Sequence, residues 1–317
     1  MIEVSAEEIY RHLPMTEAID VVRETMKLVS SGKAELPLRS IMDIDGTNKL
    51  GIMPGVLKEP TLYGVKILSL FPGNPAKGLS SHIGAVILFD SETGKPAAFL
   101  DADALTAIRT AAASAAATDA LARKEASTLA IVGTGEQAEA HIQALHPVRT
   151  LSDIRIIGRT QENAEEFIAR IQTQYPNAQF SATTDTAAAV ADADIICTVT
   201  SSSSVILEGD WIAPGTHVNA VGASVPAMQE IDQDLVLKSE LFVDYKPSAL
   251  AQARDIMTAL ETGAMQESHI LGEIGDVYAG NVLGRRSDRS ITLYRSLGIA
   301  AQDLACANHV VGKTSDR

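Results

Sequence analysis

The chain has 317 residues, of which 46% are hydrophobic and 21% charged, a composition typical of a globular protein and not of a disordered one. Its formal net charge of −14 disfavours a general nucleic-acid-binding protein, although a few cations in a cleft can still bind an anionic substrate. No apolar run reaches the length of a membrane span. Two cysteines cannot build a disulfide framework, and the N-terminus lacks a signal-peptide pattern. We therefore expect a cytoplasmic protein with no membrane and no nucleic-acid partner.

The first part of the chain predicts one helix followed by a sheet. Apolar residues of the segment 15–30 fall on one helical face, and Ser31 with Gly32 ends the helix. Residues 37–100 give short β-like runs separated by PG, GNP and ETGKP turns, which favours a mostly antiparallel sheet. The alanine-rich segment 103–123 predicts a long helix.

From residue 127 onward the pattern changes to strands that alternate with helices. STLAIVG is a continuous apolar run, as in a buried parallel strand, and a helix over 136–146 follows it. Further strands and helices alternate up to LFVDY, which predicts a doubly wound parallel sheet. Residues 290–310 are predicted to be helical and to return to the first domain. The expected fold class is α/β, with a Rossmann domain over 119–289 and a discontinuous α+β domain over 1–118 together with 290–317.

The most informative motif is the loop in LAIVGTGEQAEAHIQAL. Gly133, Gly135 and Ala138 fit the G-x-G-x-x-G/A fingerprint, in which the glycines allow a tight turn and a close approach to a pyrophosphate. The loop follows an apolar strand and opens a helix, as a βαβ unit requires, and a helix N-terminus favours phosphate. A strand–helix turn without a cofactor is the alternative. We predict that the loop binds a dinucleotide, with Thr134 as part of it.

The end of the second strand distinguishes the two nicotinamide cofactors. NAD-binding proteins usually carry an acidic residue there for the ribose 2′-hydroxyl, but this chain reads Gly158-Arg159-Thr160. Arg159 can pair with a 2′-phosphate and Thr160 can add a hydroxyl, although a solvated loop arginine is the alternative. The sequence therefore favours NADP(H), with NAD(H) possible.

Candidates for the substrate side lie in the first domain. Arg39, Lys66 and Arg109 are cations in otherwise apolar segments, and a buried cation requires an anionic partner or solvent. Lys66 can also simply point to solvent from its strand. His82 precedes a strand, and a single histidine is more often structural than catalytic. No metal-ligand spacing and no G-x-S-x-G nucleophile elbow is present, so no metal site is predicted.

These residues together resemble the ornithine cyclodeaminase/mu-crystallin family. The matching segments extend over nearly the whole chain in the family's order: LYGVK, ALTAIRTAAASAAAT, GTGEQA, HVNAVGASVP and ITLYRSLGIAAQDLA. The resemblance implies a discontinuous substrate-binding and dimerisation domain beside a Rossmann domain. It also implies hydride exchange with an imine or keto-acid carbon that carries a carboxylate, and a homodimer.

The resemblance also implies roles for individual residues. Arg39, Lys66 and Arg109 resemble the family's carboxylate-binding cations, and Lys66 is similar to the lysine proposed as proton donor in its dehydrogenases. Leu297 falls beside the substrate. The positions that contact the cofactor are Ser81, Arg109, Thr110, Glu136, Gln137, Thr198, Val221 and Ser296.

Two departures separate the chain from the cyclodeaminases of that family. Those enzymes carry a catalytic aspartate where this chain has Ser224, and a glutamate before an M-P dipeptide where this chain reads LGIMP. Ammonia loss and ring closure need a base or carboxylate, which a serine hydroxyl does not provide. Ser224 is therefore expected beside the substrate without acting as a base, and the VGAS loop is closer to the ketimine-reductase branch.

The leading hypothesis is an NADPH-dependent reductase of small cyclic imine carboxylates, Δ1-pyrroline-2-carboxylate and Δ1-piperideine-2-carboxylate, which give L-proline and L-pipecolate. Lys66 or His82 would supply the proton, and the sequence does not choose between them. The alternatives are an amino-acid dehydrogenase or open-chain imine reductase that forms alanine or aspartate, then ornithine cyclodeaminase, then a non-catalytic small-molecule-binding protein.

Overall fold

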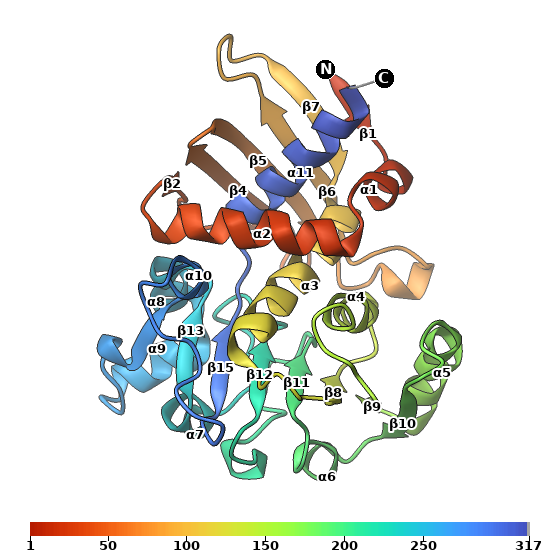
Figure 1. Cartoon of the computed structure of the whole chain (residues 1–317). Helices are drawn as coiled ribbons and strands as arrows, with labels where there is room; N and C mark the ends of the chain where they lie inside the picture. The colour runs from red at the N-terminus through yellow and green to blue at the C-terminus, as the bar shows by residue number, and fades with distance from the viewer. Residues whose placement is uncertain (316–317) are drawn as a thin grey trace. The chain divides into compact units, whose positions relative to one another are not determined.

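A computed structural model describes residues 1–315 of the chain. The chain divides into two compact units (Figure 1): unit 1 comprises Met1–Ala112 and the segment that begins at Gly298, and unit 2 comprises Ala113–Leu297. The divisions thus fall six residues before and eight residues after those expected from sequence, because helix α3 (Ala102–Leu121) runs through the first one and a strand of unit 2 precedes the second. None of the described helices is long and apolar enough to cross a membrane.

Unit 1 is built on a seven-stranded sheet. Its path is β1-β7-β6-β5-β4-β2, with β3 also paired to β4. The pairs are antiparallel apart from β1 with β7, in agreement with the mostly antiparallel sheet predicted from sequence. The strands are β1 (Ile2–Val4), β2 (Ala34–Glu35), β3 (Ser40–Asp43), β4 (Lys49–Lys58), β5 (Thr61–Leu70), β6 (His82–Phe89) and β7 (Pro96–Asp101).

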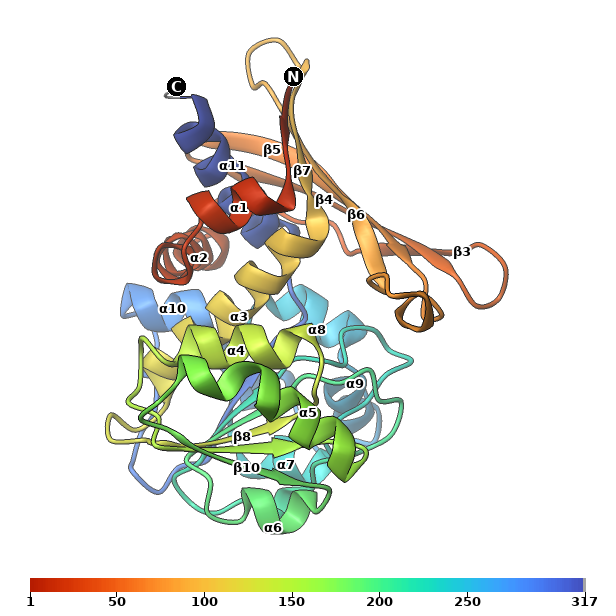
Figure 2. The same ribbon diagram turned by 90° about the vertical axis from the view of Figure 1, so that its right-hand side faces the viewer.

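The helices of unit 1 lie on one face of this sheet (Figure 2). They are α1 (Ala6–His12), α2 (Met15–Ser30) and α11 (Ala300–Ser315), together with the first half of α3. Alternate residues of β5 show which face is covered, because Gly64, Lys66 and Leu68 are buried whereas Val65 and Ile67 are only half-buried. α11 packs on β4, β5 and β6, and a Cβ at Gly64 would lie 2.8 Å from a methyl carbon of Leu304 on that helix.

Unit 2 contains an eight-stranded sheet in the order β10-β9-β8-β11-β12-β15-β13-β14, with every pair parallel. This is the doubly wound Rossmann arrangement that the alternating pattern predicted. The strands are β8 (Thr128–Val132), β9 (Asp153–Ile157), β10 (Gln179–Thr183), β11 (Ile195–Thr198), β12 (His217–Ala220), β13 (Glu240–Val243), β14 (Ile270–Glu273) and β15 (Thr292–Arg295).

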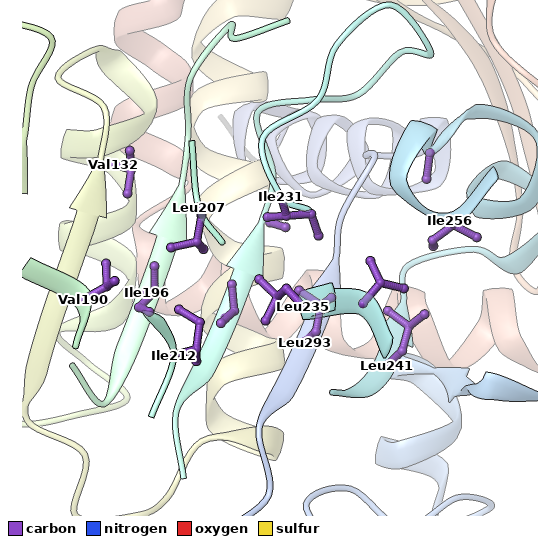
Figure 3. Close-up of a cluster of buried hydrophobic side chains, with 14 of the residues drawn as sticks. Val132, Val190, Ile196, Leu207, Ile212, Ile231, Leu235, Leu241, Ile256 and Leu293 are labelled. Atoms are coloured by element: carbon purple, nitrogen blue, oxygen red, sulfur yellow. The ribbon is translucent and has the colours of Figure 1, made fainter. Parts of the chain in front are cut away.

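Helices cover both faces of the parallel sheet, with α4 and α5 on one side and α6 and α7 on the other (Figure 2). Both faces are therefore apolar. Ile196 and Leu293 from two of the strands meet Leu235 of α7 and Ile256 of α9 in a fully buried cluster (Figure 3). The helices are α4 (Glu136–Leu145), α5 (Gln161–Ile171), α6 (Thr186–Val190), α7 (Gln233–Lys238), α8 (Lys246–Gln252), α9 (Arg254–Glu261) and α10 (Ile274–Ala279).

The helix predicted over 290–310 is wrong in its first part. Thr292–Arg295 form strand β15, which pairs with β12 on one side and β13 on the other, and every residue of it is buried. The helix α11 begins only at Ala300, after Gly298 with its positive φ of 74°. A central strand of four buried residues has no alternating pattern, so its sequence could not be told from a buried helix turn.

Candidate active-site residues

A buried group of charges lies in unit 1 where β5, α3 and α11 meet. Asp303 of α11 accepts two hydrogen bonds at one carboxylate oxygen, from Lys66 Nζ at 2.8 Å and from Arg109 Nε at 3.0 Å. The side chains of Lys66 and Asp303 are fully buried and that of Arg109 is 7% exposed. Two of the cations singled out from the sequence are thus brought together by an acid that sequence reasoning did not select.

Arg39 reaches the same region through the backbone. Its Nη2 donates to the carbonyl oxygen of Gly298 at 2.6 Å, and Gly298 itself packs against the guanidinium of Arg109. Arg109 Nη1 also donates to Gln302 Oε1 at 3.1 Å. All three predicted cations therefore lie around the turn that leads into α11.

Lys66 has a hydrogen-bond donor left for a ligand. Its ammonium donates to Asp303 and to Thr106 Oγ1, at 2.5 Å, and its third hydrogen has no acceptor among residues 1–315. Burial lowers the pKa of Lys66, the charges of Arg109 and Arg39 lower it further, and Asp303 raises it, with a result of about 8. Lys66 is therefore mostly protonated at neutral pH yet close to its titration point.

The cluster retains positive charge after its internal pairing. Burial alone would raise the pKa of Asp303, but the charges of Arg109 and Lys66 outweigh burial and hold it below the ordinary value. Within this hydrogen-bonded cluster one carboxylate faces the two cations Lys66 and Arg109. Arg109 Nη2 makes no hydrogen bond within the described chain, so it is available to a substrate carboxylate, which guanidinium groups bind well.

His82 and Ser81 lie at the start of β6. His82 Nδ1 is 2.8 Å from Ser81 Oγ, and no hydrogen bond joins the ring to Lys66 within the described chain. The residue is open to solvent on one side, yet the surrounding protein atoms, and after them the charge of Lys66, lower its pKa. A neutral His82 is a hydrogen-bonding group and not a further cation.

The glycine-rich loop of unit 2 lies at the carboxyl end of β8. Gly133 has a φ of 130°, and a Cβ there would lie 3.0 Å from the carbonyl oxygen of Val199. Gly135 is the N-cap of α4 without a side-chain cap, and a Cβ at this position would meet nothing within 4 Å. Ala138 is fully buried in the first turn. The loop that contains Thr134, Glu136 and Gln137 therefore leaves open space at a helix N-terminus, as a pyrophosphate requires.

This loop lies at the point where the strand order of the sheet reverses. From β8 the chain runs outward through β9 and β10, and then returns to the other side of β8 with β11. In open α/β sheets, ligands bind at such a switch point, outside the carboxyl ends of the strands. Thr198 ends β11 there, and its carbonyl accepts hydrogen bonds from the backbone of Val221 and Gly222 at 3.1 Å each.

The loop after β12 is fixed by buried charges. Glu230 accepts hydrogen bonds from Thr198 Oγ1 at 2.9 Å and from Ala223 N at 3.1 Å. Arg295 donates to the carbonyl oxygens of Ala220, at 3.3 Å, and Ala223, at 2.5 Å, while it pairs with Asp255. Ser224 follows Ala223 directly and is half-buried.

Two predicted cofactor contacts carry buried hydroxyls that have no hydrogen-bond partner in the described chain. These are Thr110 Oγ1 in unit 1 and Ser296 Oγ in unit 2. A buried hydroxyl without a partner costs free energy, so each fits a position that a bound ligand completes. Leu297 is 4% exposed, and its backbone nitrogen donates to Asp244 Oδ2 at 2.7 Å.

Arg159 and Thr160 follow β9, the strand beside β8. Arg159 is exposed and has no hydrogen bond or ion pair to any described residue, whereas Thr160 caps α5 by accepting from Asn163 N at 3.2 Å. Gly158 is required because a Cβ there would lie 2.8 Å from the carbonyl oxygen of Thr160. No acidic residue stands between β9 and α5.

Sequence reasoning missed Asp303, Gln302 and Glu230, all of them buried. A signal was present for the first two, because Gln302 and Asp303 are the polar pair in the apolar segment GIAAQDLACA, and a buried acid needs a cation. Glu230 follows a loop without periodicity, and no local pattern indicated its burial. No group of three or more metal-ligating side chains occurs within residues 1–315.

The doubly wound sheet with this loop at its switch point places unit 2 in the class of dinucleotide-binding α/β proteins. The chain belongs to the ornithine cyclodeaminase/mu-crystallin family, whose model matches residues 2–317. It is 33% identical over 319 residues to the Δ1-pyrroline-2-carboxylate reductase of Bacillus cereus, and the match covers 100% of this chain and 98% of that protein.

Solved structures agree with this assignment. The chain is similar to the Δ1-pyrroline-2-carboxylate reductase of Thermococcus litoralis, determined with NADH and L-proline, with a TM-score of 0.94, 32% identity, and coverage of 100% of this chain and 98% of that one. It is also similar to an archaeal alanine dehydrogenase dimer with bound NAD, with a TM-score of 0.91, 31% identity, and coverage of 100% and 96%.

Proposed function

We propose that this protein is an NAD(P)H-dependent reductase of small cyclic imine carboxylates, which converts Δ1-pyrroline-2-carboxylate to L-proline and Δ1-piperideine-2-carboxylate to L-pipecolate. The observation that carries this proposal is the buried cluster of Lys66, Arg109 and Asp303, with its surplus of positive charge and its unused donors. Full-length similarity to two Δ1-pyrroline-2-carboxylate reductases supports the same substrate class.

Arg109 and Arg39 bind the substrate carboxylate in this proposal. The unused Nη2 of Arg109 provides a charge-assisted hydrogen bond, and the anchoring of Nε on Asp303 and of Nη1 on Gln302 fixes the plane of the guanidinium. A fixed donor orients the imine and avoids much of the entropy that a mobile side chain would lose. Ser224 and Leu297 contribute to the walls around the substrate.

Lys66 supplies the proton. Reduction adds a hydride to the carbon of the C=N bond and a proton to its nitrogen, and a protonated imine accepts hydride far better than a neutral one. Lys66 has one N–H without an acceptor in the described chain, and its pKa is about 8, which suits proton transfer near neutral pH. His82 remains the alternative donor. Its lowered pKa leaves a smaller fraction of the ring protonated at neutral pH, so less of it is ready to donate a proton.

Unit 2 carries the loop that holds the pyrophosphate of the cofactor. The loop Gly133–Ala138 binds the pyrophosphate, while Thr110, Thr198, Val221 and Ser296 contact the rest of the dinucleotide. The nicotinamide supplies the hydride when it is bound. Arg159 favours NADP(H) over NAD(H), because an exposed arginine with no partner in the described chain replaces the usual acid at the end of β9. The nicotinamide ligands of the two solved relatives are NADH and NAD, so NAD(H) remains a second cofactor.

The protein acts as a homodimer in this proposal. The face of the unit 1 sheet opposite its helices carries Phe99, Ile87, Val65 and Pro54 in one cross-strand row. No described helix of unit 1 covers this face (Figure 2). An apolar sheet face that its own helices leave open is typical of an interface, and a second copy of the chain would cover it by two-fold symmetry. We also expect a cytoplasmic location, since Cys197 and Cys306 are free and buried.

An amino-acid dehydrogenase is the second candidate, because the same cation cluster binds any 2-oxo or 2-imino acid and an archaeal alanine dehydrogenase matches the full chain. One experiment separates the two. NADPH and NADH oxidation is measured with the two cyclic imine carboxylates, and with pyruvate or oxaloacetate plus ammonia. Higher kcat/KM for the cyclic imines supports the proposal, whereas turnover of the oxo acids alone would refute it.

A further inference from the structure

Asp303 makes an unusual use of its carboxylate. Both cations bond to the same oxygen, Oδ1, and the other oxygen is buried without a hydrogen-bond partner in the described chain. Another buried ion pair differs, since Arg295 Nε donates to both oxygens of Asp255, at 3.1 and 2.9 Å. An unsatisfied buried carboxylate oxygen is costly, so stability alone does not explain the arrangement at Asp303.

We propose that Asp303 is a positioning residue, which holds Arg109 and Lys66 side by side through one oxygen and keeps Lys66 charged until the substrate takes its proton. The proposal rests on the proposed function for the identity of the substrate, but not for the effect on Lys66 itself. Asp303 does not touch the reacting atoms in this scheme and acts only through the two cations.

The charges around Lys66 determine the direction of the effect. Burial and the two arginines favour the neutral amine, and Asp303 is the acid that hydrogen-bonds to Lys66. Removal of that charge leaves the opposing influences in place, so Lys66 would lose its proton at lower pH. The titratable or charged groups that face Lys66 are Asp303 and Cys306 of α11, Arg109 and Asp103 of α3, His82 of β6, and Arg39 before β3.

The shift in the pKa of Lys66 can be measured in imine reduction and in the reverse oxidation. Imine reduction needs the ammonium of Lys66, which transfers one proton to the substrate nitrogen and regains it from solvent, so kcat/KM falls as pH rises through its pKa. Oxidation of L-proline needs the neutral amine as acceptor, so kcat/KM rises over the same range. Loss of the Asp303 charge moves both transitions to lower pH, whereas a residue that only stabilises the fold changes the plateau and not the transitions.

The decisive variant is Asp303→Asn, which keeps the shape and removes the charge. We expect both transitions to move down by about one pH unit, which gives an approximately tenfold loss of reduction at alkaline pH and a smaller loss at acidic pH. Two variants serve as controls. Asp255→Asn removes the acid of the other buried pair, and Thr106→Val removes the other acceptor of Lys66 without a change in charge. Neither should move the transitions by as much. Unmoved transitions in a folded Asp303→Asn protein would overturn the proposal.

A second variant and a binding measurement keep the proposal open to refutation. Asp303→Glu keeps the charge but displaces it, so its transitions should stay in place while kcat/KM falls by about tenfold, and an undiminished kcat/KM would contradict positioning. Pyrrole-2-carboxylate, a planar anion that cannot be reduced, should bind more weakly as Lys66 loses its proton, and at lower pH in Asp303→Asn. This binding measurement does not depend on turnover. A failure of imine reduction in the wild type, with this shift present, would refute the proposed function alone.

Discussion

Gly298 and Arg109 are in direct contact: a Cβ added to Gly298 would lie 2.4 Å from Arg109 Nη1 and 3.1 Å from Nη2. Gly298 also has a φ of 74°, in the left-handed region that favours glycine, and its carbonyl oxygen accepts the hydrogen bond from Arg39. A glycine at this position therefore lets Arg39 and Arg109, the two arginines of the proposed substrate clamp, approach one turn of the backbone.

Gly298→Ala should displace the guanidinium of Arg109 and reduce kcat/KM for imine reduction by about tenfold or more, since a misplaced clamp loses orientation. The backbone strain of about 1 kcal/mol adds a loss of stability. Gly32→Ala is the matched control, because Gly32 has a φ of 75° and nothing within 4 Å of the added Cβ. Steady-state kinetics and thermal unfolding of both variants separate the two effects. Equal kinetic losses in the two would show that the Arg109 contact has no consequence.

Arg159→Asp should reverse the proposed cofactor preference, from NADPH to NADH. The variant loses the cation for a 2′-phosphate and gains the acid that hydrogen-bonds a free 2′-hydroxyl. The measured quantity is the ratio of kcat/KM for the two cofactors. Arg170→Asp makes the same change of charge at the other end of α5, at a second exposed position, and should leave the ratio unchanged. A wild-type preference for NADH would show that Arg159 does not select the phosphate.

Ile87→Glu should convert the proposed homodimer to a monomer. Ile87 lies in the middle of the open sheet face, opposite Val65 of β5 and Phe99 of β7, so a buried charge there has no partner. Light scattering at micromolar concentration gives the mass. Leu283→Glu, at a residue 79% exposed in unit 2, is the control. A monomeric wild type would contradict the homodimer outright.

The sequence predicted the fold class and the glycine-rich loop because both have local signals. The loop's glycines, the apolar strand before it and the helix after it are adjacent in the chain, and the doubly wound sheet of unit 2 agrees with the alternating pattern. Strand β15 was mistaken for helix because its four residues are buried on both sides and show no period.

The relation among the site residues could not be read from local patterns. Lys66 and Asp303 are 237 positions apart, and Arg109 and Asp303 are 194 apart, so only the packing of α11 on the sheet brings them together. The sequence identified the cations by their isolation in apolar segments. No local pattern indicated that the single acid Asp303 binds both Lys66 and Arg109, or that Glu230 holds the loop before Ser224.

The burial of His141 predicts that the folded protein loses stability in acid. It is fully buried between Ser114 Oγ and the carbonyl oxygen of Gln137, and burial lowers its pKa to about 4. The unfolded chain takes up this proton near pH 6.5 and the folded one only near pH 4, so the stabilisation is complete above pH 6.5 and is lost as pH falls. Between pH 7 and pH 4.5 this amounts to roughly 2 kcal/mol.

Urea unfolding of the wild type and of His141→Gln at the two pH values measures this contribution. Gln cannot be protonated, so the stability difference between the two proteins should narrow by roughly 2 kcal/mol at the lower pH. The exposed His146→Gln serves as control, with no such narrowing expected. A constant difference between wild type and His141→Gln would show that the pKa of His141 is the same in the folded and unfolded chains, which would contradict this prediction.

Arg109→Ala should damage imine reduction far more than Ser224→Ala, and the wild type should not convert ornithine to proline at a meaningful rate. In the proposed clamp Arg109 offers its Nη2 to the substrate carboxylate, so its removal should leave that carboxylate short of a charge-assisted partner, a loss of about 2–3 kcal/mol or roughly 30- to 150-fold in kcat/KM. It also leaves Asp303 with Lys66 as its remaining cationic partner.

The expectation for ornithine follows from two missing acids. Ser224 has no carboxylate to act as a base for amine chemistry. Met53 lies directly opposite Lys66 in the sheet, and the residue immediately before Met53 is not an acid. Kinetics of both variants with Δ1-pyrroline-2-carboxylate, and product analysis of the wild type with ornithine, check these expectations. Rapid ornithine conversion, or an Arg109→Ala enzyme with undiminished kcat/KM, would show that the cation cluster is not the substrate clamp.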